Sequence, residues 1–462
     1  MANKYKKDII VQGIARVMGG GLSFLAVFVL TYIFDESQIG EYNLILVTIN
    51  VITSIFTLWL SQGILRYYDG KKDIGFAISN MLISGVFSII MFLFINIVSK
   101  QNVSIHAYIY MLVLVFYNIF DAIFRKERHL ISYVVLELLL ATSRIFPMVV
   151  IALITKDYNA VFISQYILMF AYIFIYLLFS KSIKNISFSV DKKLLFKYLK
   201  FGLPLLGLSV SNWLLTSSDR YMIKYFKDDF SVGIYSTNYS LGNSIYMMFA
   251  LIMINAFHPI IVKAWDKDKV EGRNLISKVL DYYILLVAPL VFYGCLKSKI
   301  LLGLLKNDTY SEYNDVFIWT VLGIFVYGLS LLYHKYYELT ENTGKILMFN
   351  LLVAVFNISL NIILIPRMGF SIAAFTTFLA YLMYFALVRA STYKVFNVSF
   401  SLNKAIKILV SVILFWILDY KVSPSDNIMT FFIEGFIYVI YTMITYQVFR
   451  IIDIRSLVIK SL

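Results

Sequence analysis

The sequence is poor in cysteine and in charge. Its single cysteine, Cys295, excludes an intramolecular disulfide and a cluster of thiolate metal ligands. Only 15% of the 462 residues are charged, against about 25% in soluble domains. The sequence also has no glycine-rich phosphate loop, no His/Cys spacing for a metal site and no nucleophile elbow. We therefore expect neither a soluble domain nor an enzyme, and no cofactor or metal.

Apolar residues are abundant instead. They make up 60% of the chain, the mean hydropathy is +0.79, and runs of about 20 apolar residues recur from end to end. A helix of that length crosses the ~30 Å hydrocarbon layer of a bilayer, so we expect an all-α polytopic membrane protein. The sequence predicts about fourteen transmembrane helices, near residues 9–33, 41–65, 75–99, 105–124, 131–154, 160–180, 201–225, 232–262, 279–305, 314–337, 345–365, 369–389, 405–420 and 427–449.

The distribution of lysine and arginine predicts the orientation. Of the 41 Lys and Arg residues, 29 fall in the loops and termini on one side of these helices and nine fall on the other side. Cytoplasmic loops are enriched in Lys and Arg, so we expect a multi-pass protein of the cytoplasmic membrane with both termini in the cytoplasm. The net charge of +14 is dispersed over many short loops, which argues against a nucleic acid partner.

A short motif occurs twice and indicates an internal repeat. Residues 34–42 read FDESQIGEY, and the spacing of its Gly40 and Tyr42 recurs in Gly233 and Tyr235. We expect two parallel six-helix lobes, helices 1–6 and 7–12, around a central cavity, plus two C-terminal helices. The predicted boundaries are 1–184 for the N-terminal lobe, 185–200 for a cytoplasmic amphipathic linker, 201–391 for the C-terminal lobe and 392–462 for the extra pair.

A polar stripe runs along the predicted helix 201–225. Four polar residues at spacings of 3, 4 and 3 share one helical face: Ser209, Asn212, Thr216 and Asp219. Each buried polar group needs a partner in protein or water, so we expect this face to line a wet cavity. Side chains of adjacent helical residues point about 100° apart, and we expect Asp219 and Arg220 not to pair with each other.

Three further arginines are candidates for the same cavity. Arg144 lies at the middle of the predicted helix 131–154, where a charge costs roughly 2.5–3.5 kcal/mol; the alternative to a cavity is a pair with a carboxylate on a neighbouring helix. Arg16 lies two turns inside the first helix and Arg66 ends the second, so snorkelling and interfacial anchoring stay open for them. Glu137 shares a face with Arg144 but lies about 10 Å away along the helix, too far for a direct pair.

The candidate substrate-binding residues are Arg16, Arg66, Arg144, Arg220, Asp219, Asn212 and Thr216. Asp219 and Glu137 are the candidate acids for coupling to H⁺ or Na⁺. For two other acids, Asp281 and Glu434, we expect structural pairing or an interfacial position. Three asparagines of the predicted helix 345–365 share a face, as lumen lining or as interhelical hydrogen bonds: Asn350, Asn357 and Asn361.

Several segments resemble Wzx-type polysaccharide flippases. Within 201–245, FGLPLL, SNWLLTSSDRYMIKYF and VGIYSTNYSLGNSI are similar to the seventh and eighth helices of that family. Two segments of the first half look like the counterpart of these helices: FDESQIGEYNL (34–44) and SQGILRYY (61–68). Two further segments are similar to other turns of the family: FRKERHLISYVV (124–135) and NISLNIILIPRMGFSIAAFTTFLAY (357–381). The family belongs to the multidrug/oligosaccharidyl-lipid/polysaccharide (MOP) exporter superfamily, with the MATE exporters and the lipid II flippase MurJ.

The resemblance implies a flippase that moves undecaprenyl-diphosphate-linked oligosaccharide from the inner to the outer leaflet by alternating access. It implies a lipid-linked oligosaccharide diphosphate and the bilayer as partners, with polysaccharide polymerase and assembly proteins as further candidates, and we expect a monomer. One alternative is a cation- or proton-coupled MATE-like drug exporter, which acids on helices one and seven would favour. A membrane polysaccharide polymerase is less favoured, because every predicted outer loop is short.

Overall fold

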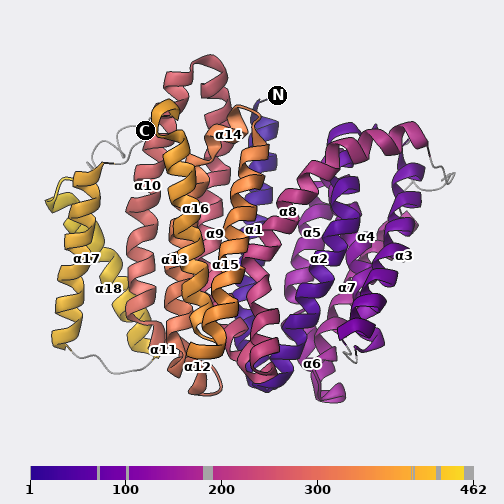
Figure 1. Ribbon diagram of the computed structural model, residues 1–462, viewed down its shortest axis with the longest axis horizontal. Helices are drawn as coiled ribbons and strands as arrows, with labels where there is room; N and C mark the ends of the chain where they lie inside the picture. Colours follow the sequence, from indigo (N-terminus) through magenta and orange to yellow (C-terminus); the bar gives the residue numbers. More distant parts are fainter. Residues whose placement is uncertain are drawn as a thin grey trace. The chain divides into compact units, whose positions relative to one another are not determined.

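The computed structural model describes residues 2–69, 73–99, 103–179, 191–396, 398, 401–422 and 428–451 (Figure 1). All regular elements in these ranges are helices, so the all-α prediction is confirmed. The chain divides into two compact units, Met1–Ser236 and Thr237–Leu462. Helix α9 (Asp229–Lys267) runs from the first unit into the second.

The first unit contains the eight helices before α9. They are α1 (Ala2–Ile33), α2 (Glu36–Tyr67), α3 (Ile74–Ser99), α4 (Ile105–Glu127), α5 (Leu130–Thr142), α6 (Phe146–Thr155), α7 (Asn159–Phe179) and α8 (Lys192–Phe226). Helix α2 packs against α3, α4 and α8, α4 packs against α7, and α1 packs against α5. The hydrophobic core of the unit is built largely from buried side chains of α2, α3, α4 and α7.

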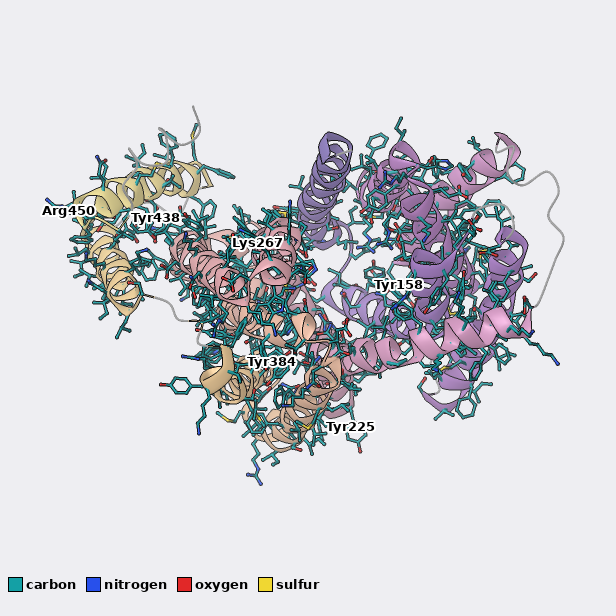
Figure 2. The ribbon with its side chains drawn as sticks, turned by 90° about the horizontal axis from the view of Figure 1, so that it is seen from above. Tyr158, Tyr225, Lys267, Tyr384, Tyr438 and Arg450 are labelled. Atoms are coloured by element: carbon teal, nitrogen blue, oxygen red, sulfur yellow. The ribbon has the colours of Figure 1, made fainter. Side chains whose placement is uncertain are left out.

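The second unit follows α9. Its helices are α10 (Lys269–Leu296), α11 (Ser298–Leu302), α12 (Thr309–Glu312), α13 (Asn314–Tyr333), α14 (Lys335–Leu339), α15 (Thr343–Met368), α16 (Ile372–Phe396), α17 (Leu402–Val422) and α18 (Ile428–Val448). Helix α13 packs against α10 and α16, and α16 packs against α15. The last two helices attach to α10, where Tyr438 of α18, labelled in Figure 2, stacks on Tyr293 at 5.2 Å between ring centroids.

The membrane-spanning character follows from helix length and composition. In the described ranges, eleven helices are long and apolar enough to cross a membrane, and the bent pair α5–α6 is a twelfth if it forms one span. The described part of α1 adds a shorter apolar segment, Met18–Ile33. A polytopic membrane protein is therefore confirmed, whereas the count of fourteen spans stays a prediction.

The predicted helix 131–154 is not continuous. Helix α5 ends at Thr142 and α6 begins at Phe146, and the two are bent by 40°. Pro147 explains the break, because its ring lacks an N–H group and would clash with the carbonyl four residues earlier in a continuous helix. Arg144 therefore lies in a turn between two half-helices and not in the middle of one.

Helix α8 begins inside the predicted linker 185–200. The Asp191 carboxylate accepts hydrogen bonds from the amides of Lys193 and Leu194, at 2.8 and 3.3 Å, and so caps the first turn. The second half of the predicted linker is thus continuous with the membrane span, and residues 185–190 lie outside the described residues. Helix α8, which was predicted to open the C-terminal lobe, packs on α2 in the first unit.

Two glycines allow α8 to approach α2 closely. A Cβ atom on Gly63 would strike the ring of Tyr198, and one on Gly202 would strike the backbone of Trp59. Tyr198 is fully buried there. This close contact fixes the start of α8 against the end of α2.

Two acids and two asparagines of the second unit have structural partners. Lys404 reaches Asp281 at 3.0 Å, and Lys297 reaches Glu434 at 2.7 Å, so the predicted pairing of these acids is confirmed. Asn357 and Asn361 of α15 hydrogen-bond to Thr376 of α16. The alternative of interhelical hydrogen bonds therefore holds for these two asparagines.

Candidate functional site

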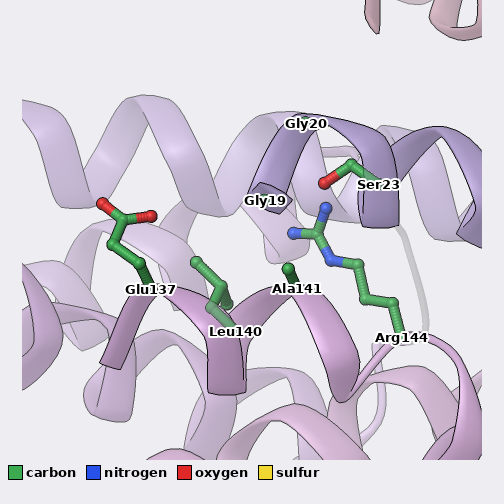
Figure 3. Close-up of a pocket in the computed structure, with 7 residues that line it drawn as sticks. All are labelled: Gly19, Gly20, Ser23, Glu137, Leu140, Ala141 and Arg144. Atoms are coloured by element: carbon green, nitrogen blue, oxygen red, sulfur yellow. The ribbon is translucent and has the colours of Figure 1, made fainter. Parts of the chain in front are cut away.

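A pocket of about 150 Å³ lies between α1 and α5 in the first unit (Figure 3). Seven residues of these helices and of the turn after α5 line it: Gly19, Gly20, Ser23, Glu137, Leu140, Ala141 and Arg144. Of the candidate residues, the pocket brings together Glu137, from the middle of α5, and Arg144, from the turn after it. The other candidates are not among its lining residues.

The break after α5 and the glycines of α1 create the pocket. Arg144 lies in the turn between α5 and α6, and Figure 3 shows its guanidinium pointing toward Ser23 on α1. Gly19 and Gly20 have no side chains, so the α1 wall of the pocket leaves room for the guanidinium and for a ligand. The pocket therefore combines a cation, an acid and a hydroxyl on an otherwise apolar wall.

Tyrosines from neighbouring helices surround the arginine. The guanidinium of Arg144 interacts with the hydroxyls of Tyr42 on α2 and Tyr110 on α4, and the contact with Tyr110 is a hydrogen bond. Both tyrosines are almost fully buried. Tyr117 of α4 interacts with Arg144 and also hydrogen-bonds to Glu137. Neutral hydroxyls orient the guanidinium without cancelling its charge.

Arg144 keeps hydrogen-bonding capacity for a ligand. Its Nε atom is buried and has no hydrogen-bond partner among the described groups. Guanidinium groups present several donors in a fork that matches carboxylate and phosphate oxygens. The pocket can therefore bind an anionic oxygen group at Arg144.

Asp219 and Arg220 of α8 form a separate buried group. Asp219 is 1% exposed and Arg220 is 6% exposed, and their charged atoms lie 3.5 Å apart. The expectation that they would not pair is wrong, because their flexible side chains bend toward each other from adjacent positions. The hydroxyl of Tyr235 donates a hydrogen bond to Asp219, and Arg220 donates to the carbonyl of Thr216 at 3.0 Å.

The remaining candidates differ in exposure. Asn212 is exposed, and Thr216 is half-buried with its hydroxyl donating to the carbonyl of Asn212 at 3.0 Å. Arg66 is exposed at the end of α2 and lies over the ring of Phe201, 4.4 Å from its centroid. The side chain of Arg16 lies outside the described residues.

Sequence reasoning did not single out Tyr42, Tyr110 or Tyr117 as partners of the charged groups. The chain has 35 tyrosines, and no spacing marks these three as neighbours of Arg144. Tyr42 had a weak signal, since it belongs to the repeated Gly-x-Tyr motif. Its equivalent, Tyr235, likewise contacts a candidate charged residue, since its hydroxyl donates a hydrogen bond to Asp219.

Two family models match the chain. The polysaccharide biosynthesis protein model matches residues 5–265, and the MatE model matches residues 204–363. The first match covers more than half of the chain and includes the whole first unit after its first four residues. A search of curated proteins gave no match.

Solved structures share the fold at low sequence identity. The lipid II flippase MurJ in its inward closed conformation is 16% identical with a TM-score of 0.69, covering 97% of this chain and 99% of that one. A multidrug resistance MATE family transporter of the MOP superfamily, facing inward, is 14% identical with a TM-score of 0.55, covering 84% and 99%. MATE in the straight conformation is 15% identical with a TM-score of 0.51, covering 84% and 96%.

Proposed function

This chain belongs to the polysaccharide biosynthesis protein family, and on that premise we propose that it is a flippase for lipid-linked oligosaccharide. Its substrate would be an undecaprenyl-diphosphate-linked repeat unit, which moves from the inner to the outer leaflet of the cytoplasmic membrane by alternating access. The product would supply the assembly of a cell-surface polysaccharide. The observation that carries the proposal is Arg144, which lines the pocket between α1 and α5 and whose Nε–H has no hydrogen-bond partner among the described groups.

The chemistry of the pocket suits a diphosphate. Such a group presents oxygens that accept two parallel hydrogen bonds from one guanidinium. The volume of about 150 Å³ is below the ~300–1,000 Å³ of sites for drug-sized ligands. We therefore assign the charged linkage to this pocket, while the sugars and the isoprenoid chain remain outside it.

Glu137 gives the pocket a means of coupling. A carboxylate that lines the same pocket would repel the diphosphate when it is ionised, and would repel it less when it is protonated or carries Na⁺. Uptake of H⁺ or Na⁺ would thus favour substrate binding, and loss of the ion would favour release. The hydrogen bond with Tyr117 connects the two charged groups to α4.

A MATE-like drug exporter is the second candidate, favoured by the match of the MatE model to residues 204–363. Exporters of cationic drugs use buried acids to hold their substrates. Asp219 is the buried acid in this region, but Arg220 and Tyr235 already occupy its oxygens. A neutralised pair attracts a cationic drug weakly, so we favour the flippase.

The test is lipid analysis in cells that lack the protein. We expect undecaprenyl-linked oligosaccharide to accumulate in a form inaccessible from outside, and a plasmid copy to clear it. The Arg144→Ala variant should fail to clear it, with a loss of at least about tenfold, and Arg144→Lys should be partly active because it cannot bind bidentately.

The matched control is Arg367→Ala, which removes an exposed arginine from α15. It should clear the lipid as well as the wild type does. Unchanged lipid pools in the deletion strain, together with sensitivity to cationic dyes, would replace the flippase with the drug exporter. Normal clearance by Arg144→Ala would remove the pocket from the mechanism.

A further inference from the structure

Three cations from three helices meet where α2 ends. Arg66 lies in the last turn of α2 with its guanidinium carbon 4.4 Å from the ring centroid of Phe201. Lys197 of α8 places its ammonium 4.2 Å from the ring centroid of Tyr67. The ammonium of Lys126 on α4 donates to the carbonyl of Arg66 at 3.3 Å. We call these three residues the α2-end cluster.

Aromatic rings and carbonyls hold these cations, and no acid among the described residues does. The rings of Tyr67 and Phe201 lie 5.7 Å apart and edge to face, so they form one platform under Arg66 and Lys197. Lys126 also donates to the carbonyl of Leu65 at 3.0 Å. Ring faces and the carbonyls at a helix C-terminus attract cations without neutralising them.

Three acids of this region are committed to other groups. Glu127 accepts a hydrogen bond from the hydroxyl of Tyr68 at 3.1 Å, Asp73 accepts from the amide of Asp69 at 2.7 Å, and Asp121 pairs with Arg125. Among the described residues, no carboxylate forms an ion pair with a member of the α2-end cluster. The cluster therefore carries three positive charges in fixed positions.

We propose that the α2-end cluster binds the phosphate group of a membrane lipid. The cluster lies at the end of a membrane span, where lipid headgroups are found. Arg66 offers a fork of donors to phosphate oxygens, and the two lysines add charge from neighbouring helices. The proposal goes beyond the transport function, because it holds for a phospholipid and for an isoprenoid diphosphate alike.

The first turns of α8 extend the cluster as a surface for lipid. Lys193, Phe196 and Lys200 are exposed on them, and Phe196 is 70% exposed. The opposite face, with Tyr198, is buried against α2. A basic face that also presents an aromatic side chain is typical of helices that contact anionic bilayer surfaces.

Lipid binding to the purified full chain tests the proposal without a transport assay. The probes are phosphatidylglycerol and farnesyl diphosphate, with dioleoylglycerol and farnesol as their counterparts without phosphate, and bound lipid is counted by native mass spectrometry. We expect at least tenfold preference for a phosphate-bearing probe. Arg66→Gln and Lys197→Gln should each lower its affinity about fivefold or more, while Lys192→Gln, which removes an exposed lysine of the same helix, should change it less than twofold.

Phe201→Leu separates a built site from a simple excess of positive charge. It keeps every charge but removes the ring under Arg66, and we expect it to lower the affinity with a melting temperature close to that of the wild type. Preference for phosphatidylglycerol assigns the cluster to bilayer phospholipid, and preference for farnesyl diphosphate assigns it to an isoprenoid carrier. Equal binding of probes with and without phosphate, or equal losses in Arg66→Gln and Lys192→Gln, would overturn the proposal.

Discussion

Gly40 of α2 and Gly233 of α9 pack face to face at the start of their helices. A Cβ atom on Gly40 would overlap the carbonyl of Asp229, and one on Gly233 would overlap the carbonyl of Glu36. Glu36 lies four residues before Gly40 in α2, and Asp229 lies four residues before Gly233 in α9. Each glycine thus meets the carbonyl at the same position of the other helix, and the two contacts are equivalent. The two copies of the Gly-x-Tyr motif therefore meet in the folded first unit.

We expect Gly233→Ala to reduce the amount of folded protein in the membrane and to lower its thermal stability. The added methyl group meets backbone atoms, which cannot move aside as a side chain can, and overpacking of this kind costs about 1–3 kcal/mol or more. Melting in detergent measures the effect. Gly344→Ala is the matched control, because a Cβ there meets nothing within 4 Å; an equal loss in both variants would contradict the explanation.

The tyrosines around Arg144 should matter for transport more than for folding. Tyr110→Phe removes one hydroxyl that hydrogen-bonds to the guanidinium, and hydrogen bonds to charged groups contribute about 1.5–3 kcal/mol. We expect transport of lipid-linked oligosaccharide to fall about tenfold with the protein still inserted. Tyr225→Phe, at the exposed position labelled in Figure 2, should leave transport unchanged. Full transport in Tyr110→Phe would show that Tyr110 does not position Arg144.

Lys297 holds the last two helices to α10. It is 4% exposed and contacts Asp419 of α17 and Glu434 of α18, at 2.7 Å each. Burial alone would lower the pKa of Lys297, but the hydrogen bonds and charges of the two carboxylates raise it above its ordinary value. A raised pKa means that the ammonium form stabilises the fold up to pH values near 10 and that this contribution is lost as the pH rises further.

We therefore expect Lys297→Met to destabilise the second unit at neutral pH by about 3 kcal/mol, because it leaves two carboxylates near each other in a largely buried place. Limited proteolysis should cut between α17 and α18 or after α18 earlier than in the wild type. The double change Asp419→Asn with Glu434→Gln in the Lys297→Met background should restore part of the protection. No difference between single and triple variants would contradict an electrostatic cause.

Helix positions were predictable from sequence because each span needs about 20 apolar residues in a row. The predicted helix 41–65 corresponds to α2, and 75–99 to α3, within a few residues. The break at Arg144 was missed although Pro147 signals it, since hydropathy alone does not register a bend. A search for apolar runs also places the start of α8 too late, because the first turns of this helix are basic.

The site was only partly predictable. Spacing along one helix placed Glu137 and Arg144 on the same face, and the structure puts both in one pocket. Contacts between helices have no such signal, so the tyrosines of α2 and α4 could not be assigned. The pairing of Asp219 with Arg220 was predicted wrongly, because the angle between adjacent residues says little about long side chains that share a buried space.

Asp228, the residue immediately before α9, should give the folded protein a pH-dependent stability. Asp228 accepts a hydrogen bond from the amide of Ser231 at 2.8 Å, and this bond lowers the pKa of its carboxyl below the ordinary value. A lowered pKa stabilises the folded state above the unfolded pKa of about 3.9, and the contribution is lost as the pH falls through the folded value.

We expect Asp228→Ala to lower the melting temperature at pH 7, with a cost of about 1 kcal/mol typical of a lost helix cap. The difference from the wild type should shrink when both are measured below pH 4. Asp266→Ala, at an exposed position near the other end of α9, should show no such pH dependence. A gap that stays constant with pH would mean that the carboxylate charge is not the cause.

Asp219 and Glu137 are the two acids on which coupling could depend, and their surroundings give them different expected roles. Asp219 is 1% exposed and bound by Arg220 and Tyr235, so removal of its charge should act on folding. Breaking a buried pair costs about 3–5 kcal/mol, and Asp219→Ala should therefore accumulate poorly in the membrane. Glu137 instead lines the pocket with Arg144, where a change in charge acts on the ligand.

Two neutral variants of similar shape separate these roles when transport is measured across a range of pH or Na⁺ concentration. Glu137→Gln should keep the protein folded but remove most of the ion dependence, because the amide cannot take up or release a proton. Asp219→Asn keeps a hydrogen bond acceptor for Tyr235 but leaves Arg220 unneutralised, so it should lower the melting temperature and leave the ion dependence of the remaining activity unchanged. The reverse pattern would assign coupling to α8 and leave the acid of the α1–α5 pocket with a structural role.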